Sequence, residues 1–98
     1  MDKAIVIEKL RAHESELKAA GILHLRLFGS VARGEADEKS DVDLMADFDK
    51  SMRLTIFNLV GLQNRLTDLL GVQVDLAEAD RLRQHVRPDV MRDAVTAF

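Results

Sequence analysis

The chain has 98 residues, of which 47% are hydrophobic and 32% are charged, with a formal net charge of −3 and no cysteine. This composition excludes a disordered chain, disulfides and thiolate metal sites, and we expect one domain over residues 1–98 in the cytoplasm. The apolar stretches are short and interrupted by charges, so we expect no membrane span. No basic and then apolar leader pattern follows Met1, so we expect no secretory signal. The acidic balance and the small number of aromatic residues, four Phe in all, argue against direct binding of long nucleic acid.

The first part of the chain is predicted to form a helix and a strand. Apolar residues at helical spacing indicate a helix from about residue 2 to residue 20, and Gly21 is a typical stop. Residues 22–28 alternate as a half-buried strand does, with leucines facing the core (Leu23, Leu25, Leu27) and other residues on the open side (His24, Arg26, Phe28). A glycine-serine turn ends this strand, and a short helical turn is expected after it.

A second strand and a longer helix are predicted next. The strand runs from about residue 41 to residue 48, after a polar loop. Leucines at helical spacing then predict a helix over about residues 54–70, with Thr55 as a possible cap and Gly71 as the stop.

The last part is predicted to add a third strand and a helical tail. Residues 72–77 alternate cleanly, and the tail from Asp80 is expected to form one or two short helices interrupted near Pro88. The order of elements predicts an α+β fold, with a small three-stranded mixed sheet and helices packed on one face.

Three aspartates and a serine are predicted to share the open side of this sheet. Asp41 and Asp43 alternate with core residues of the second strand, Asp75 does so in the third strand, and Ser30 continues the open-side parity of the first. Carboxylates placed together repel one another unless a cation neutralises them, and oxygen ligands favour Mg²⁺ or Mn²⁺. A carboxylate shared between two such ions would give the two-metal arrangement of nucleotidyl transfer.

The glycine-serine turn is the second half of the predicted site. Gly29 lets the backbone approach a phosphate closely, and the Ser30 hydroxyl can donate to a phosphate oxygen. Arg33 is interpreted either as an electrostatic contact to phosphate or as a structural partner for a nearby acid. Each feature alone is more often structural, but their combination at this spacing favours a catalytic site. Four further acidic residues are interpreted as a solvated rim: Asp37, Glu38, Asp47 and Asp49.

Residues 29–44 read Gly-Ser-Val-Ala-Arg-Gly-Glu-Ala-Asp-Glu-Lys-Ser-Asp-Val-Asp-Leu. This stretch resembles the GSxARGxxxxxSDxDL signature of the minimal nucleotidyltransferase (MNT) family, within the polymerase-β-like nucleotidyltransferase superfamily. The resemblance extends over almost the whole chain and implies the nucleotidyltransferase fold. Members of the family are the antitoxins of HEPN–MNT toxin–antitoxin pairs, and they transfer AMP from ATP to a tyrosine of the HEPN toxin, which silences its RNase activity.

The resemblance also implies roles for individual residues. Gly29 and Ser30 would form the triphosphate-binding turn, beside Arg33. The metal-binding carboxylates would be three aspartates that hold two Mg²⁺ ions: Asp41, Asp43 and Asp75. Asp75 would also help to deprotonate the attacking hydroxyl. The tail departs from the family pattern, because members often end in a longer helix that contains aromatic residues, and this chain has no tyrosine.

Two other functions stay open at this point. One is nucleotidyl transfer to a small molecule, as in the aminoglycoside-modifying enzymes of the same superfamily, although those enzymes carry further domains. The other is an antitoxin that neutralises its toxin by stoichiometric binding and has a vestigial site. The complete set of turn and carboxylates favours an enzyme, because a scaffold has no need for clustered carboxylates.

Overall fold

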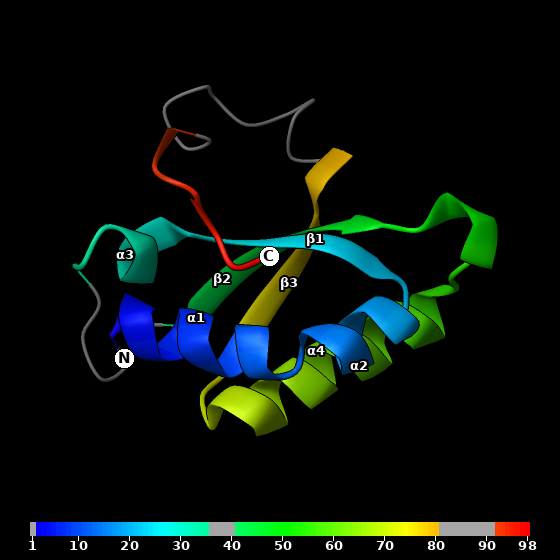
Figure 1. The fold of residues 1–98 in the computed structure, drawn as a ribbon, viewed down its shortest axis with the longest axis horizontal. Coiled ribbons are helices and arrows are strands. Elements are labelled where there is room, and N and C mark those ends of the chain that lie inside the picture. The colour runs from blue at the N-terminus through cyan, green and yellow to red at the C-terminus, as the bar shows by residue number, and fades with distance from the viewer. Residues whose placement is uncertain (1, 36–40, 81–91) are drawn as a thin grey trace.

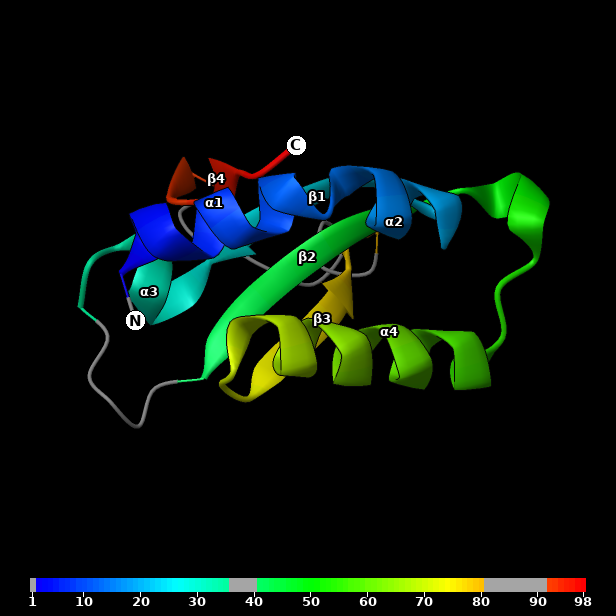
Figure 2. The same cartoon turned by 60° about the horizontal axis from the view of Figure 1, so that its bottom comes forward.

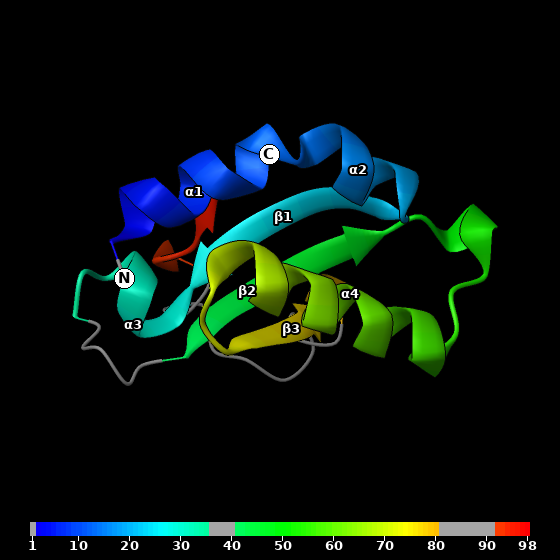
Figure 3. The ribbon, with the colours of Figure 1, turned by 90° about the horizontal axis from the view of Figure 1, so that it is seen from below.

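The computed structural model describes residues 2–35, 41–80 and 92–98 (Figure 1). The elements are, in chain order, α1 (Lys3–Ala12), α2 (Glu14–Ala19), β1 (Ile22–Phe28), α3 (Gly29–Ala32), β2 (Val42–Phe48), the 3₁₀ helix η1 (Lys50–Met52), α4 (Ile56–Leu70), β3 (Val74–Glu78) and β4 (Val95–Thr96). Helices α1, α2 and α4 lie on one face of the sheet (Figures 2 and 3). The predicted α+β fold, with a small mixed sheet and helices on one face, is therefore confirmed.

The described sheet has four strands in the order β3-β2-β1-β4. β1 is antiparallel to both β2 and β4, whereas β2 and β3 are parallel and are connected through α4. The prediction of three strands was wrong by one, because Val95 and Thr96 pair with β1. Two residues are too few to show alternation in a sequence. The helices predicted around Pro88 fall on residues 81–91, which lie outside the described residues.

The first predicted helix is divided at His13 into α1 and α2. The ring Nδ1 of His13 lies 2.9 Å from the carbonyl oxygen of Lys9, which a continuous helix would pair with the His13 backbone N–H. That N–H donates instead to the carbonyl of Leu10, at 3.1 Å. A local side-chain contact of this kind competes with the helix ladder, and single-residue propensity does not reveal it.

The alternation predicted for β1 fails at the first residues of the strand. Leu23 was predicted to face the core but is 44% exposed, whereas Ile22 is fully buried. The register with β2 shifts between Ile22 and His24, as in a β-bulge. One extra residue on β1 turns Leu23 outward, and the predicted alternation resumes at Leu25 and Leu27, which are fully buried.

Helix α4 begins at Ile56, two residues after the predicted start, but it is capped by Thr55 and ends before Gly71 as the sequence indicated. The Thr55 hydroxyl accepts from the backbone N–H of Asn58, and the Asn58 side chain accepts from the Thr55 N–H. Both hydrogen bonds of a capping box are therefore present. Gly71 ends the helix in the left-handed conformation, with φ of +72°. The buried side of α4 packs with the other helices and the sheet into one core: Val6, Leu10, Leu17, Ile22, Leu25, Leu27, Val42, Leu44, Ala46, Leu62, Leu66, Leu70 and Val74 are among its members.

Side chains of α4 also cover the outer edge of β3. The Thr67 hydroxyl accepts from the backbone N–H of Val74 at 3.2 Å, and the Gln63 side-chain oxygen accepts from that of Leu76 at 3.0 Å. These bonds satisfy donors that an edge strand otherwise presents to other chains. Within the described ranges, no helix has the length and apolar character needed to cross a membrane.

Candidate active site

Asp43 and Asp75 lie side by side on adjacent strands. The parallel register of β2 and β3 pairs these two residues, and on its other side Asp43 is paired with Phe28 of β1. The two residues that flank Asp43 are fully buried among the helices, so the Asp43 side chain points to the opposite side of the sheet. Asp41 is exposed and lies two residues earlier, just before β2 begins. The structure thus brings the three predicted aspartates to one end of one face.

The carboxyl of Asp43 lies in an environment that disfavours its charge. Partial burial raises the pKa of Asp43, and the negative charges of Asp75 and Asp41 raise this pKa further. The positive charge of Arg33 acts in the opposite direction and is the smallest of these effects. The four side chains therefore share one electrostatic environment, in which a bound proton or cation at Asp43 is favourable.

Gly29 adjoins the Asp43 carboxylate directly. A Cβ atom built on Gly29 would collide with the Asp43 Oδ2 atom, and the φ of Gly29 is +76°, a conformation that L side chains rarely adopt. Sequence reasoning explained this glycine by the approach of a phosphate. The structure adds a second requirement that no local pattern shows: Gly29 leaves the space that Asp43 occupies.

Ser30 and Arg33 belong to the turn that follows Gly29. Ser30 is in the first turn of α3, is partly buried, and its carbonyl accepts from the Glu35 N–H at 2.9 Å. The Nε of Arg33 donates to the carboxylate of Glu35 at 3.1 Å, on the surface. Arg33 thus has a structural partner and also acts on the charge of Asp43, so the structure is compatible with both roles considered from the sequence.

The three aspartates offer the oxygen atoms that Mg²⁺ prefers, and their shared charge is what a cation would neutralise. Asp41 and Asp75 are exposed, and no hydrogen bond or ion pair to another described residue holds either side chain. As the side chains lie, no group of three or more His, Asp or Glu within residues 2–35, 41–80 and 92–98 surrounds a common metal position. The donor set therefore fits a divalent cation in chemical type, and binding one would require the two exposed carboxylates to turn toward it.

The side of the sheet that carries the aspartates is not open along its whole length. Met45 follows Asp43 on this side, pairs with Arg26 and Ala77, and is 1% exposed. The expected open side is thus covered at Met45, and it is accessible toward its two ends, at the carboxylates and at His24, which pairs with Asp47. Alternation could not reveal this, because it assigns a side to each residue but says nothing of what covers that side.

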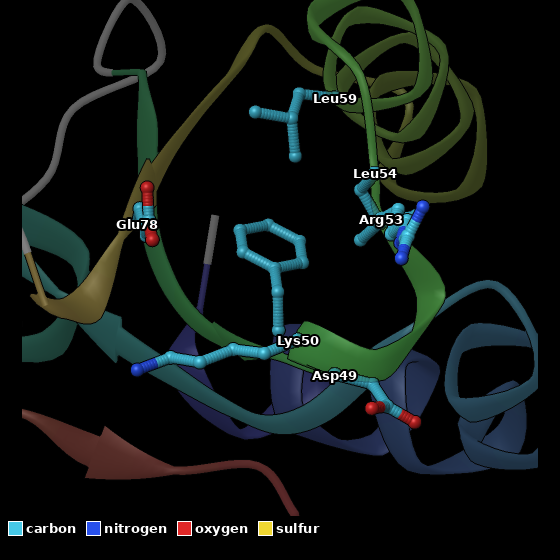
Figure 4. A pocket seen from close by; sticks show the side chains of 7 residues that line it. Asp49, Lys50, Arg53, Leu54, Leu59 and Glu78 are labelled. Atoms are coloured by element: carbon cyan, nitrogen blue, oxygen red, sulfur yellow. The ribbon is translucent and has the colours of Figure 1, made fainter.

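A separate groove of about 240 Å³ lies at the other end of β2 (Figure 4). It is lined by Phe48, Asp49, Lys50, Arg53, Leu54, Leu59 and Glu78, none of which is a predicted site residue. In Figure 4 Leu59 and Leu54 border the groove on the helix side, and Glu78 stands across from them. The carboxylates and this groove are therefore at opposite ends of the parallel strand pair.

Comparison with known proteins agrees with the fold and the motif. Residues 7–96 match the family model of the nucleotidyltransferase domain. The chain is 39% identical, over 87 residues, to the protein adenylyltransferase MntA of Thermococcus cleftensis. This alignment covers 88% of this chain and 86% of that protein. A solved structure described as a minimal nucleotidyltransferase superposes with a TM-score of 0.74 at 37% identity, over 97% of this chain and 95% of the other.

A more distant structure shares the fold. It comes from a crystal structure of a toxin–antitoxin with AMP-PNP, and it superposes with a TM-score of 0.63 at 20% identity, over 90% of this chain and 72% of that chain. These matches define an enzyme class. The chain belongs to the nucleotidyltransferase domain family and is a nucleotidyltransferase.

Proposed function

We propose that this enzyme transfers AMP from ATP to a hydroxyl side chain of a protein, in a reaction that requires Mg²⁺ and for which Mn²⁺ can substitute. The acceptor is a tyrosine of a HEPN-type RNase toxin, and the chain acts as its antitoxin in the cytoplasm. The observation that carries this proposal is the register pair of Asp43 and Asp75, with Asp41 and Gly29 beside it, on a nucleotidyltransferase fold. The name of the relative, a protein adenylyltransferase, supports the reaction, and the toxin–antitoxin neighbour supports the partner.

The proposed chemistry is a single in-line displacement. The acceptor oxygen attacks the α-phosphorus of ATP; a new phosphorus–oxygen bond forms as the bond to the oxygen bridging toward the β-phosphate breaks, and pyrophosphate leaves. Asp75 accepts the proton of the hydroxyl. Gly29 and Ser30 position the triphosphate, with Arg33 contributing positive charge. The three aspartates would hold Mg²⁺, which would supply charge neutralisation when bound, and the residues themselves contribute mainly positioning.

A protein acceptor agrees with the exposure of the site. Asp41 and Asp75 are both exposed, and they lie at an end of the sheet rather than inside an enclosed cavity. A side chain on the surface of another folded protein can therefore reach them. A small-molecule acceptor would need walls to hold it, since small-molecule sites usually bury most of the ligand surface.

The test is substoichiometric neutralisation. A HEPN-type RNase toxin is incubated with Mg-ATP and about one tenth of an equivalent of this chain, since an enzyme turns over and a stoichiometric binder does not. The chain is then removed, and RNase activity and intact mass of the toxin are measured. We expect lasting inactivation and a mass increase of one or more AMP units.

Two results would redirect the proposal. If RNase activity returns on separation and the mass of the toxin is unchanged, the chain is a binding antitoxin. If the toxin is untouched while ATP is consumed with a small hydroxyl compound, the enzyme is a small-molecule nucleotidyltransferase. Ser30→Ala is the matched variant: it should slow modification by about 10- to 100-fold through loss of one phosphate contact while leaving simple complex formation nearly unchanged.

A further inference from the structure

The first half of α4 presents large apolar side chains to solvent. Ile56, Phe57 and Val60 are 68%, 83% and 51% exposed, whereas the leucines on the opposite side of the helix fill the core. A helix that is apolar on both sides is usually covered on both sides. We call the outward side of this half, with Ile56, Phe57, Val60 and Gly61, the α4 surface.

The α4 surface lies on a stretch without charge. Residues 56–64 include no Asp, Glu, Lys or Arg, although 32% of the chain is charged. Solvent-facing helix surfaces normally carry charges, and interface centres are depleted of them. Without like charges, two identical surfaces can also approach each other without repulsion.

Gly61 is an independent sign of close contact. Glycine inside a helix costs about 1 kcal/mol relative to alanine. A Cβ atom on Gly61 would meet no atom within 4 Å among the described residues, so no contact within that part of the chain requires a glycine there. Gly61 leaves a notch in the exposed surface, one helical turn after Phe57 and on the same side.

We propose that the α4 surface pairs with the α4 surface of a second copy of this chain. The two helices run antiparallel and cross midway between Phe57 and Gly61, so that Phe57 of each copy packs over the Gly61 notch of the other. A projecting ring and a notch one turn apart make the surface self-complementary about a two-fold axis. The glycine lets the two helix backbones approach closely at the crossing.

The position of the surface favours a second copy over a modified substrate. The N-terminal half of α4 lies at the end of the molecule away from α3, the turn that adjoins the carboxylates (Figures 2 and 3). A dimer formed there leaves both carboxylate sites accessible, whereas an acceptor protein docked there would be directed away from them. Because the surface is small, the dimer should be weak, with a dissociation constant on the order of micromolar.

Sedimentation equilibrium of the purified chain tests the proposal. We expect a reversible monomer–dimer equilibrium over a range of about 1 to 300 µM, as a contact of this size predicts. A monomer at every concentration would overturn the proposal. A monomer that loses HEPN-type protein binding on Phe57→Glu would likewise overturn it and would assign the surface to that partner.

Two variants separate loss of contact from loss of fold. Phe57→Glu should weaken dimerisation by about 100-fold or more, because it places a charge on each side of the crossing. Gly61→Gln should weaken it by about tenfold or more while raising the melting temperature, since glutamine is a better helix former and its side chain has free space in the monomer. Ile5→Glu on α1 is the control: Ile5 is 46% exposed, and its replacement should leave dimerisation unchanged.

Cross-linking adds a geometric check, since the chain has no cysteine. Val60→Cys should form a disulfide-linked dimer on oxidation, and Ser15→Cys on α2 should not. A dimer that neither Phe57→Glu nor Gly61→Gln weakens would show that another surface is used. Apart from the binding check with the HEPN-type protein, these measurements involve neither ATP nor a toxin, so their outcome is separate from that of the proposed reaction.

Discussion

The two sides of β2 differ in their effect on stability. On the helix side, Val42, Leu44 and Ala46 are fully buried, and removing their apolar surface from water stabilises the fold. On the other side Asp43 is partly buried within the field of two further carboxylates, which disfavours its charge. The same strand therefore stabilises the fold through the residues on its helix side and carries an unfavourable charge cluster on its other side, and such clusters are common at functional sites.

The largest expected effect is on activity when Asp43 changes. Asp43→Asn should lower AMP transfer by about 10³-fold, the scale for losing a preorganised electrostatic group, while the protein remains folded. Release of pyrophosphate and circular dichroism measure the two properties. Asp47→Asn, on the same side of β2, is the control and should retain activity. Loss of the fold on Asp43→Asn would instead give Asp43 a structural role.

A substitution in the core between the sheet and the helices should have the reverse effect, a loss of stability without a loss of activity. Leu66→Ala removes a fully buried α4 side chain and should lower the free energy of unfolding by about 2–5 kcal/mol. Activity per folded molecule should be unchanged. Leu23→Ala, at an exposed leucine, should change stability by less than about 0.5 kcal/mol. Urea denaturation of both variants decides this, and equal losses would mean that the core is not where the structure puts it.

Gly29 lies against the Asp43 carboxylate, and Gly71, which has a similar backbone conformation, is its control. Both have nearly the same positive φ, +76° and +72°, so alanine should strain each backbone by about 1 kcal/mol. Only at Gly29 does the new Cβ displace Asp43. Gly29→Ala should therefore lower activity by about 100-fold, as small misplacements of catalytic groups do, and Gly71→Ala should not. Equal activities of the two variants would show that the contact between Gly29 and Asp43 does not matter for catalysis.

Much of the fold followed from patterns within single elements. Helix α4 was predictable because Thr55, Gly71 and the leucine spacing all act locally. The division of the first helix at His13, the bulge at Leu23 and the pairing of Val95 with β1 were not, because each depends on one side chain or on residues distant in sequence.

The site was predictable to a similar extent. Strand parity and the family motif selected Asp41, Asp43 and Asp75, and the structure brings them to one end of one face. The contact between Gly29 and Asp43 and the covered position of Met45 depend on the tertiary structure. The assignment of these residues to metal and nucleotide stays a prediction for experiment.

The smallest expected effect concerns stability without metal. The raised pKa of Asp43 means that the folded state holds its proton more tightly than the unfolded state, so ionisation of Asp43 destabilises the fold as pH rises through that pKa. In EDTA at neutral pH, Asp43→Asn should therefore melt slightly higher than the parent. Below about pH 3.9, where the carboxyl is protonated in both states, the difference should disappear. A parent that is more stable than the variant at neutral pH would contradict a repulsion among these carboxylates.

Calorimetric titration of ATP into the unmodified chain tests most directly whether the carboxylates form a metal-dependent nucleotide site. The carboxylates should repel a bare triphosphate and attract one that carries divalent cations. We predict binding in the presence of Mg²⁺ that weakens by about tenfold or more, or vanishes, when EDTA removes the metal. Equal affinity in the two conditions would contradict the account, because the three aspartates would then contribute nothing to nucleotide binding through a cation.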